Sequence, residues 1–198
     1  MKKNNKLYMF KDRNDYVKKI TDDDVINVIG TKGSGKTTST LKYINDDDYI
    51  VINCDRLLEL PEDKLVEDKE LSKIRDILKD KYGTITEGKD FINYYNDILK
   101  YIKEKKKKAL IEGNIIQDIE PITKLKGTVI VKRTGIIKCF FRAIKRDYPN
   151  KYFMNIEVEK HGKILGRFYR LKNITKRRKN IFKKYHEIEN IIEQLELL

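Results

Sequence analysis

A glycine-rich stretch near the start of the chain, VINVIGTKGSGKTT, combines the residue types that hold phosphate groups. It covers residues 25–38, and residues 30–37 within it fit G-x-x-x-x-G-K-[ST] without a mismatch. Glycines let backbone amides approach phosphate oxygens, a lysine can neutralise the β- and γ-phosphates, and a hydroxyl can ligate Mg²⁺. A glycine-rich turn that matches by chance is the alternative. The β-rich run before the motif and the helical run after it favour a phosphate-binding loop.

The motif predicts a role for each of its residues. Lys36 is the predicted catalytic cation, and Thr37 is a predicted Mg²⁺ ligand. ATP and Mg²⁺ are the expected cofactors; a guanine-reading N-K-x-D motif is not evident, although the sequence leaves GTP open as the donor. The predicted nucleotide-binding residues are Gly30, Thr31, Lys32, Gly33, Ser34, Gly35, Lys36, Thr37 and Thr38.

Two acidic residues follow later β-rich runs. Asp55 comes directly after YIVINC, and Glu112 comes directly before Gly113 in ALIEG. Ligands of an open α/β sheet lie at the carboxyl ends of its strands, so Asp55 could accept a proton from an attacking hydroxyl or bind a metal. Glu112 could hold Mg²⁺ or contact a substrate hydroxyl. From the residues alone, Asp55 could equally cap the following helix, and Glu112 could end its strand only because the chain surfaces there.

Arginines gather in the segment RTGIIKCFFRAIKRD. Arg142 and Arg146 are four residues apart and so share one helix face, and Arg133 precedes them. Guanidinium groups suit the charge that spreads over a transferring phosphoryl group, which makes Arg142 and Arg146 candidate catalytic residues. Arg133 and Arg56, which follows Asp55, are candidate substrate contacts. An exposed basic helix face is the alternative for this helix.

Short β-rich runs alternate with helical patterns, which predicts a mostly parallel sheet with helices on both faces. Residues 7–10 fit either an edge strand or the approach to a helix beginning near Asp12. Residues 151–173 fit either a strand or a helix, with a break at His161 and Gly162. The β-rich runs lie at 24–30, 49–54, 109–113 and 128–132, and the helical patterns at 36–44, 62–81, 89–107, 135–147 and 176–195.

The composition fits one ordinary domain. The chain has 198 residues, enough for a sizeable core. No apolar run approaches the about 20 residues that span a bilayer, and no secretory signal is evident, so we expect a cytoplasmic protein without membrane contact. Cys54 and Cys139 lack CxxC spacing, which favours reduced thiols over a zinc site shared with His161 and His186.

The chain is strongly basic, with 44 Lys and Arg against 31 Asp and Glu and a formal net charge of +13. Such an excess attracts nucleic acids, anionic membranes or phosphorylated small molecules and does not choose among them. KEKKKK at residues 103–108 is interpreted as the solvated end of a helix. KRRKNIFKKYH at residues 176–186 could cover the adenine, contact a nucleic-acid backbone or face solvent, and solvent is the default.

The order of these motifs resembles that of the P-loop kinases, in particular the branch with uridine kinase, polynucleotide 5′-hydroxyl kinase and the zeta-toxin kinases. The resemblance rests on the phosphate loop, VINCD, LIEG and RAIKRD, and covers about the first three quarters of the chain. It implies that Asp55 is the base toward the substrate hydroxyl, that Glu112 contacts substrate or metal, and that Arg142 and Arg146 belong to a lid. Two features depart from it: VIVKRTG is basic where an acidic residue is usual, and YPNKYFMNIEVEKHGK has no counterpart.

The resemblance implies a three-layer P-loop NTPase domain over residues 1–198, with a basic helical lid at about 133–165 and a C-terminal helix at about 176–195. The implied activity is transfer of the γ-phosphate of ATP to a hydroxyl of a nucleoside, a nucleotide or a nucleic acid. A hydroxymethylated base, as a phage-type DNA-modifying kinase would use, belongs to the last group. A P-loop ATPase that drives a partner is the alternative from another class, and a nucleotide-dependent binding module is a third.

Overall fold

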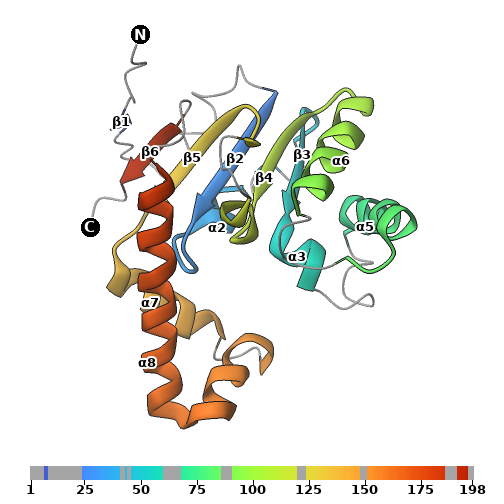
Figure 1. Cartoon of the computed structure of the whole chain (residues 1–198). Coiled ribbons are helices and arrows are strands. Elements are labelled where there is room, and N and C mark those ends of the chain that lie inside the picture. The colour runs from blue at the N-terminus through green and yellow to red at the C-terminus, as the bar shows by residue number, and fades with distance from the viewer. Residues whose placement is uncertain are drawn as a thin grey trace.

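The strands that the structure describes form one sheet in the order β1-β6-β5-β2-β4-β3, and the pairs between them are parallel (Figure 1). The computed structural model describes residues 7–8, 24–40, 43, 46–59, 68–85, 91–119, 124–147, 151–185 and 191–195. The strands are β1 (Leu7–Tyr8), β2 (Val25–Gly30), β3 (Tyr49–Asn53), β4 (Lys108–Glu112), β5 (Thr128–Arg133) and β6 (Ile191–Leu195). The helices are α2 (Lys36–Thr40), α3 (Cys54–Glu59), α5 (Lys69–Tyr82), α6 (Phe91–Glu104), η2 (Ile115–Asp118), α7 (Ile136–Asp147) and α8 (Lys151–Tyr185).

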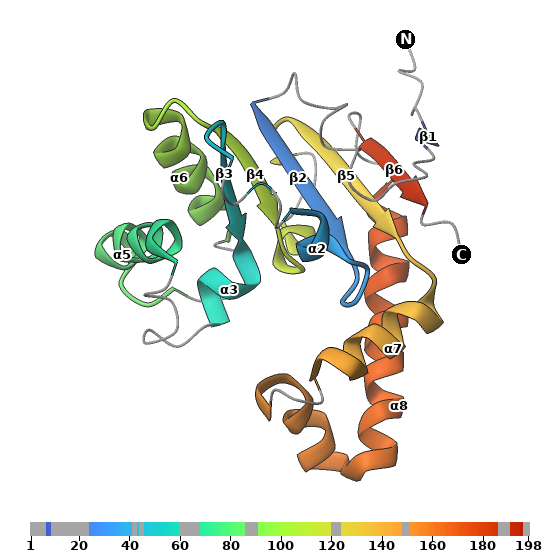
Figure 2. The same ribbon diagram turned by 180° about the vertical axis from the view of Figure 1, so that it is seen from behind.

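Helices lie on both faces of the sheet, which gives the three layers that the sequence predicts. Figure 1 views the sheet from the side of α6 and the C-terminal half of α8, and Figure 2 from the side of α2. The strand β4 shows why two faces are covered. Ala109 and Ile111 belong to the core beneath α6, whereas Leu110 belongs to the core on the α2 side with Ile26 and Ile130. Every β4 side chain is thus apolar except the last, Glu112, and the first, Lys108.

The strand order places β2, which precedes the phosphate loop, between β4 and β5. The strand that follows the loop, β3, does not pair with β2 but with β4, so β4 lies between them. Glu112 at the end of β4 is therefore in register with Val28 on one side and with Asn53 on the other. The carboxyl ends of three parallel strands meet at one edge of the sheet, as the predicted site requires.

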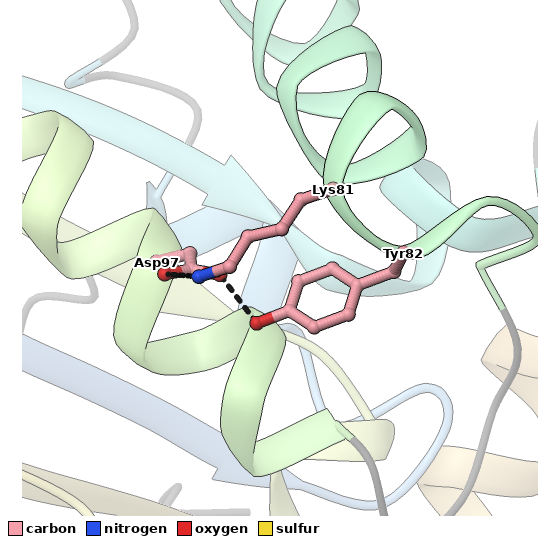
Figure 3. Close-up of polar contacts among 3 residues, drawn as sticks. All are labelled: Lys81, Tyr82 and Asp97. Atoms are coloured by element: carbon pink, nitrogen blue, oxygen red, sulfur yellow. Dashed lines mark hydrogen bonds and ion pairs between the residues drawn. The ribbon is translucent and has the colours of Figure 1, made fainter.

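The helices α5 and α6 are joined by a cluster of polar side chains at the end of α5 (Figure 3). Lys81 Nζ contacts both Asp97 carboxylate oxygens at 2.8 Å, and the Tyr82 hydroxyl donates to Asp97 Oδ2 at 2.6 Å. Partial burial acts to raise the pKa of Asp97, but the hydrogen bonds from Lys81 and Tyr82 outweigh it and hold the pKa below its usual value. The ionised carboxylate therefore stabilises the packing of α5 against α6.

Asp97→Asn should reduce stability in a pH-dependent way. Because the folded-state pKa lies below the unfolded value of about 3.9, the contribution of Asp97 is complete above that pH and is lost as the pH falls through the folded-state pKa. We expect urea unfolding at pH 7 to show a loss of about 0.5–1 kcal/mol, and a smaller loss near pH 3. Asp76→Asn, on the exposed side of α5, is the matched control and should change little. Equal losses at both pH values would contradict this assignment.

The C-terminal prediction is wrong in its last part. The helix predicted over 176–195 ends at Tyr185 as part of α8, and Ile191–Leu195 forms β6. IIEQL has good helix formers, but β5 presents an unpaired edge, and β6 pairs with it in parallel from Val129 to Arg133. Tertiary pairing thus overrides local propensity.

Two segments left open by the sequence have defined structures. Leu7 and Tyr8 form a short edge strand beside β6, while the helix considered near Asp12 lies outside the described residues. Residues 151–173 are helical, and α8 bends at Gly162, which has φ 75° and ψ 168°. A residue with a side chain rarely adopts that φ, so the break predicted at His161 and Gly162 is confirmed. None of the described helices is long and apolar enough to cross a membrane.

Candidate functional site

The phosphate loop joins β2 to α2 at the centre of the sheet and is covered by the start of α7. The Ser34 amide donates to the Thr31 carbonyl oxygen at 3.1 Å, which closes a turn inside the loop. Gly33 has φ 81°, and a Cβ at this position would lie 2.3 Å from the Cys139 carbonyl oxygen. The Thr31 hydroxyl lies 3.4 Å from Cys139 Sγ. Both the turn and the close approach of α7 therefore require glycine at position 33.

Lys36 is held inside this loop. Its side chain is buried, with 6% of the residue exposed, although lysine is among the residues least often buried. Lys36 Nζ donates to the carbonyl oxygens of Gly30 at 2.9 Å and Thr31 at 3.3 Å. It also donates to Asn114 Oδ1, in the loop after β4, at 3.1 Å. The ammonium group thus links the phosphate loop to the neighbouring strand end.

Asp55 does not cap the helix that contains it. The cap of α3 is Asn53, whose Oδ1 accepts from the Arg56 amide at 2.9 Å. Asp55 instead binds the loop after β4: its Oδ1 accepts from the amides of Asn114 at 2.7 Å and Ile115 at 3.3 Å. Its Oδ2 accepts from Asn114 Nδ2 at 2.8 Å. The carboxylate is therefore fixed at the edge of the sheet where the strand ends meet.

Asn114 connects the two predicted catalytic groups, and sequence reasoning missed it. Its side-chain amide donates to Asp55 through Nδ2 and accepts from Lys36 through Oδ1. Gly113 permits this approach, because a Cβ there would lie 3.1 Å from Asp55 Oδ1. The signal in the sequence is small: an Asn follows the Glu-Gly pair that ends a β-rich run. Only the adjacency of β3 and β4 gives that Asn its partners.

Glu112 is buried rather than surfacing at its strand end, with 1% of the residue exposed. Its Oε1 accepts from Asn53 Nδ2 at 2.6 Å, and Thr37 lies near enough to its carboxylate to influence its pKa. Burial and the nearby Asp55 raise the pKa of Glu112, while Lys36, Thr37 and the hydrogen bond from Asn53 oppose the rise. The two residues predicted to ligate Mg²⁺, Thr37 and Glu112, thus lie near each other. Their proximity agrees with the predicted metal site without testing it.

Glu112→Gln should stabilise the fold at neutral pH. Because the folded-state pKa is raised, the carboxyl group favours folding at low pH, and this advantage is lost as the pH rises from about 4.3 through the folded-state pKa. Gln can still accept the Asn53 hydrogen bond but never ionises, so urea unfolding at pH 8 should show a gain of about 1 kcal/mol over the parent protein. Near pH 4 the difference should shrink. Glu104→Gln, at the exposed end of α6, is the control, and a loss of stability at pH 8 with Glu112→Gln would refute the assignment.

A second buried lysine contacts the phosphate loop from β5, and the sequence did not single it out. Lys132 is 4% exposed, lies opposite Gly30 in the strand register, and donates to Ser39 Oγ at 2.6 Å and to the Gly35 carbonyl oxygen at 3.3 Å. The sequence showed only that this strand end is basic where the kinases that it resembles are usually acidic. Lys132 and Lys36 direct two positive charges at one loop, which favours an anion beside it.

The predicted arginines occupy different parts of the molecule. Arg56 lies half-buried on α3, and Arg142 lies half-buried on α7. The side chains of Arg133 and Arg146 lie outside what the structure describes. The lid role of Arg142 and Arg146 therefore stays a prediction, as do the substrate contacts of Arg56 and Arg133.

A further arginine, missed from the sequence, holds α3 in place. Arg75 of α5 is buried and donates through Nε to the Leu57 carbonyl oxygen at 2.7 Å and through NH2 to the Arg56 carbonyl oxygen at 3.1 Å. These carbonyl groups lie near the C-terminus of α3, where helical partners run out. Arg75 thus positions the short helix that carries Asp55. A helical pattern alone gives no sign of this role.

The buried Cys54 thiol lies beside the site but behaves as a core side chain. Burial, with the neighbouring Asp55 and Glu112 carboxylates, raises the pKa of Cys54 well above its usual value. The group stays a thiol at neutral pH and behaves as a small core residue. No three His, Cys, Asp or Glu side chains gather as a metal cluster among the described residues.

These features define the P-loop NTPase fold: a parallel sheet between helices, with the phosphate loop leaving its central strand. The chain matches no protein-family model and no curated protein sequence. Solved structures with a similar fold include shikimate kinase from Acinetobacter baumannii in complex with shikimate, at 17% identity and a TM-score of 0.45, over 88% of this chain and 83% of that one. Deoxyadenosine kinase from M. mycoides, with the products dCMP and dCDP, is similar at 14% identity and a TM-score of 0.42, over 85% and 88%. TT1252 from Thermus thermophilus is similar at 11% identity and a TM-score of 0.46, over 85% and 87%.

Proposed function

We propose that this protein is an ATP-dependent phosphotransferase that moves the γ-phosphate of ATP to a hydroxyl group. The observation that carries the proposal is the connected set Lys36–Asn114–Asp55 at the carboxyl ends of β2, β4 and β3. A lysine in a phosphate loop and a carboxylate held at a fixed place beside it are the groups that phosphoryl transfer to a hydroxyl needs. Glu112 and Thr37 lie next to this set.

The residues present fit a nucleoside triphosphate. Ser34 Oγ, within the loop, is buried and has no hydrogen-bond partner among the described residues, which leaves a donor for a phosphate oxygen. Lys36 and Lys132 both supply positive charge to the loop, through contacts with Gly30 and Gly35. Thr37 and Glu112 would hold Mg²⁺, since this ion accepts one carboxylate and one hydroxyl when phosphate oxygens and water complete its octahedron. When bound, Mg²⁺ would neutralise charge on the phosphates.

Asp55 has capacity left to act as the base. Its Oδ1 already accepts two backbone amides, whereas its Oδ2 accepts only Asn114 Nδ2 among the described contacts. A carboxylate oxygen has two acceptor positions, so Oδ2 is the atom that would take the proton of the acceptor hydroxyl. The acceptor oxygen would then bond to the γ-phosphorus as the bond from that phosphorus to the β-phosphate oxygen breaks, which releases ADP. Lys36 would stabilise the charge on the departing side.

The acceptor is a nucleoside, a nucleotide or a nucleic acid in this proposal, including a hydroxyl on modified DNA. A transfer screen tests it: the protein is incubated with Mg²⁺ and γ-labelled ATP against nucleosides, nucleotides, and DNA and RNA with free 5′-hydroxyls or hydroxymethylated bases. We expect one class to become labelled. Parallel reactions with GTP give the donor preference. ATP hydrolysis that no acceptor stimulates, with no labelled product, would overturn the proposal and favour an ATPase that drives a partner.

A further inference from the structure

The net positive charge of this protein is accounted for by the segments of two helices. The segments of α7 and α8 contain 16 of the 44 Lys and Arg residues but only three of the 31 Asp and Glu residues. The basic residues of these two segments outnumber the acidic ones by 13, which equals the net charge of the whole chain. The rest of the chain therefore contains equal numbers of basic and acidic residues. Between residues 160 and 185 there is no acidic residue. A lysine-rich composition spread over the whole surface does not explain this separation.

The outward face of α8 carries a continuous row of exposed side chains. Leu165 and Phe168, at 57% and 63% exposure, begin the row. Four exposed lysines continue it at helical spacing: Lys172, Lys176, Lys179 and Lys183. These lysines span about 16 Å at 1.5 Å per residue. We call Leu165, Phe168 and the four lysines the α8 row.

The opposite side of α8 packs on the protein. Ile174 and Ile181 are buried there, and Arg178 donates to the Thr134 carbonyl oxygen in the connection between β5 and α7. Thr134 in turn donates through its hydroxyl to the Ser34 carbonyl oxygen of the phosphate loop at 2.9 Å. Figures 1 and 2 show α8 beside α7 and extending beyond the sheet. The α8 row therefore faces away from the phosphate loop.

We propose that the α8 row binds single-stranded nucleic acid. Lysines in series along one helix face match a linear chain of phosphates, and an aromatic side chain at the end of such a row is a platform for a base. A protein partner is less well matched, because protein interfaces are depleted in lysine. A helix that lies on a bilayer needs an apolar stripe along its length, with lysines on either side of that stripe. In the last turns of α8, lysines occupy the middle of the outward face, where the apolar stripe would have to be. The inference is independent of the proposed phosphotransferase activity.

Salt-dependent binding to a labelled single-stranded oligonucleotide, without ATP, tests the four lysines. For the parent protein we expect affinity to fall steeply with salt. Replacing Lys172, Lys176, Lys179 and Lys183 by Gln should weaken binding at least tenfold and reduce the log–log salt slope by about 3. The matched control replaces the exposed residues Lys100, Lys103, Lys106 and Lys124 by Gln, which changes the charge equally outside α7 and α8 and should leave the slope unchanged. Equal effects of the two variants would overturn the proposal.

Phe168→Ala tests the stacking component. We expect roughly tenfold weaker binding to the single strand and little change for a duplex of the same length. Ile77→Ala, which removes an exposed apolar side chain from α5, is the control. Lys36→Ala should retain oligonucleotide binding, so loss of catalysis and loss of this surface are separable. If vesicles with anionic lipid or an acidic polypeptide bind the protein through these lysines while the oligonucleotide does not, the nucleic-acid assignment is wrong.

Discussion

Replacing Lys36 by alanine is expected to lower phosphate transfer at least about 100-fold, because it removes the charge nearest to the phosphates in the proposed transition state. The structure adds a second reason. Lys36 Nζ is hydrogen-bonded to Gly30, Thr31 and Asn114, so its loss also releases the loop after β4 from the phosphate loop. Initial rates with γ-labelled ATP and the acceptor found in the screen measure the effect.

Two comparisons separate the lost charge from lost folding. Lys36→Met keeps most of the side-chain volume and should be as inactive as the alanine variant, since neither presents an ammonium group. Lys103→Ala, an exposed position near the end of α6, should keep the parent rate. Thermal unfolding without nucleotide should show both Lys36 variants folded. Turnover within a few-fold of the parent protein in either Lys36 variant would show that the loop does not act on phosphate as proposed.

The parts of this molecule that are determined by residues adjacent in the sequence could be predicted from the sequence. The phosphate loop is encoded by adjacent residues, and the central strands are apolar runs that keep their identity in any parallel sheet. Both therefore appear in the structure where the sequence places them. Glu112 was placed at its strand end correctly, but its burial depends on Asn53 and Val28 in the flanking strands.

Features that depend on strand order could not be predicted in the same way. Asn114 meets Asp55 and Lys36 only because β4 lies between β2 and β3, and no sequence pattern gives that order. The same holds for Lys132, whose partners Gly35 and Ser39 follow β2, the strand that pairs with β5. For β6, local propensity and sheet pairing favour different structures, and the open edge of β5 decides between them.

The strongest test of the site exchanges the side-chain carboxylate of Asp55 and the side-chain amide of Asn114 between the two positions. Asp55→Asn keeps an oxygen for the backbone amides of Asn114 and Ile115, but it sets one amide NH₂ against another at Asn114 Nδ2. We expect transfer to fall at least about 100-fold, a typical contribution of a general base, while ATP binding changes little. The fall has two sources, the lost base and the lost hydrogen bond.

Asn114→Asp in the same chain restores the hydrogen bond in reverse. The new carboxylate can accept from the amide at position 55 and still accept from Lys36 Nζ, so the connection between the strand ends is kept while the negative charge moves from position 55 to position 114. If Asp55 only positions the loop, the double variant recovers transfer; if Asp55 takes the proton of the acceptor hydroxyl, stability recovers and transfer does not. We expect the second result, with the double variant near the parent in urea unfolding and as slow as Asp55→Asn in transfer. Recovery of transfer would remove Asp55 from the chemistry and leave it a positioning residue for the loop after β4.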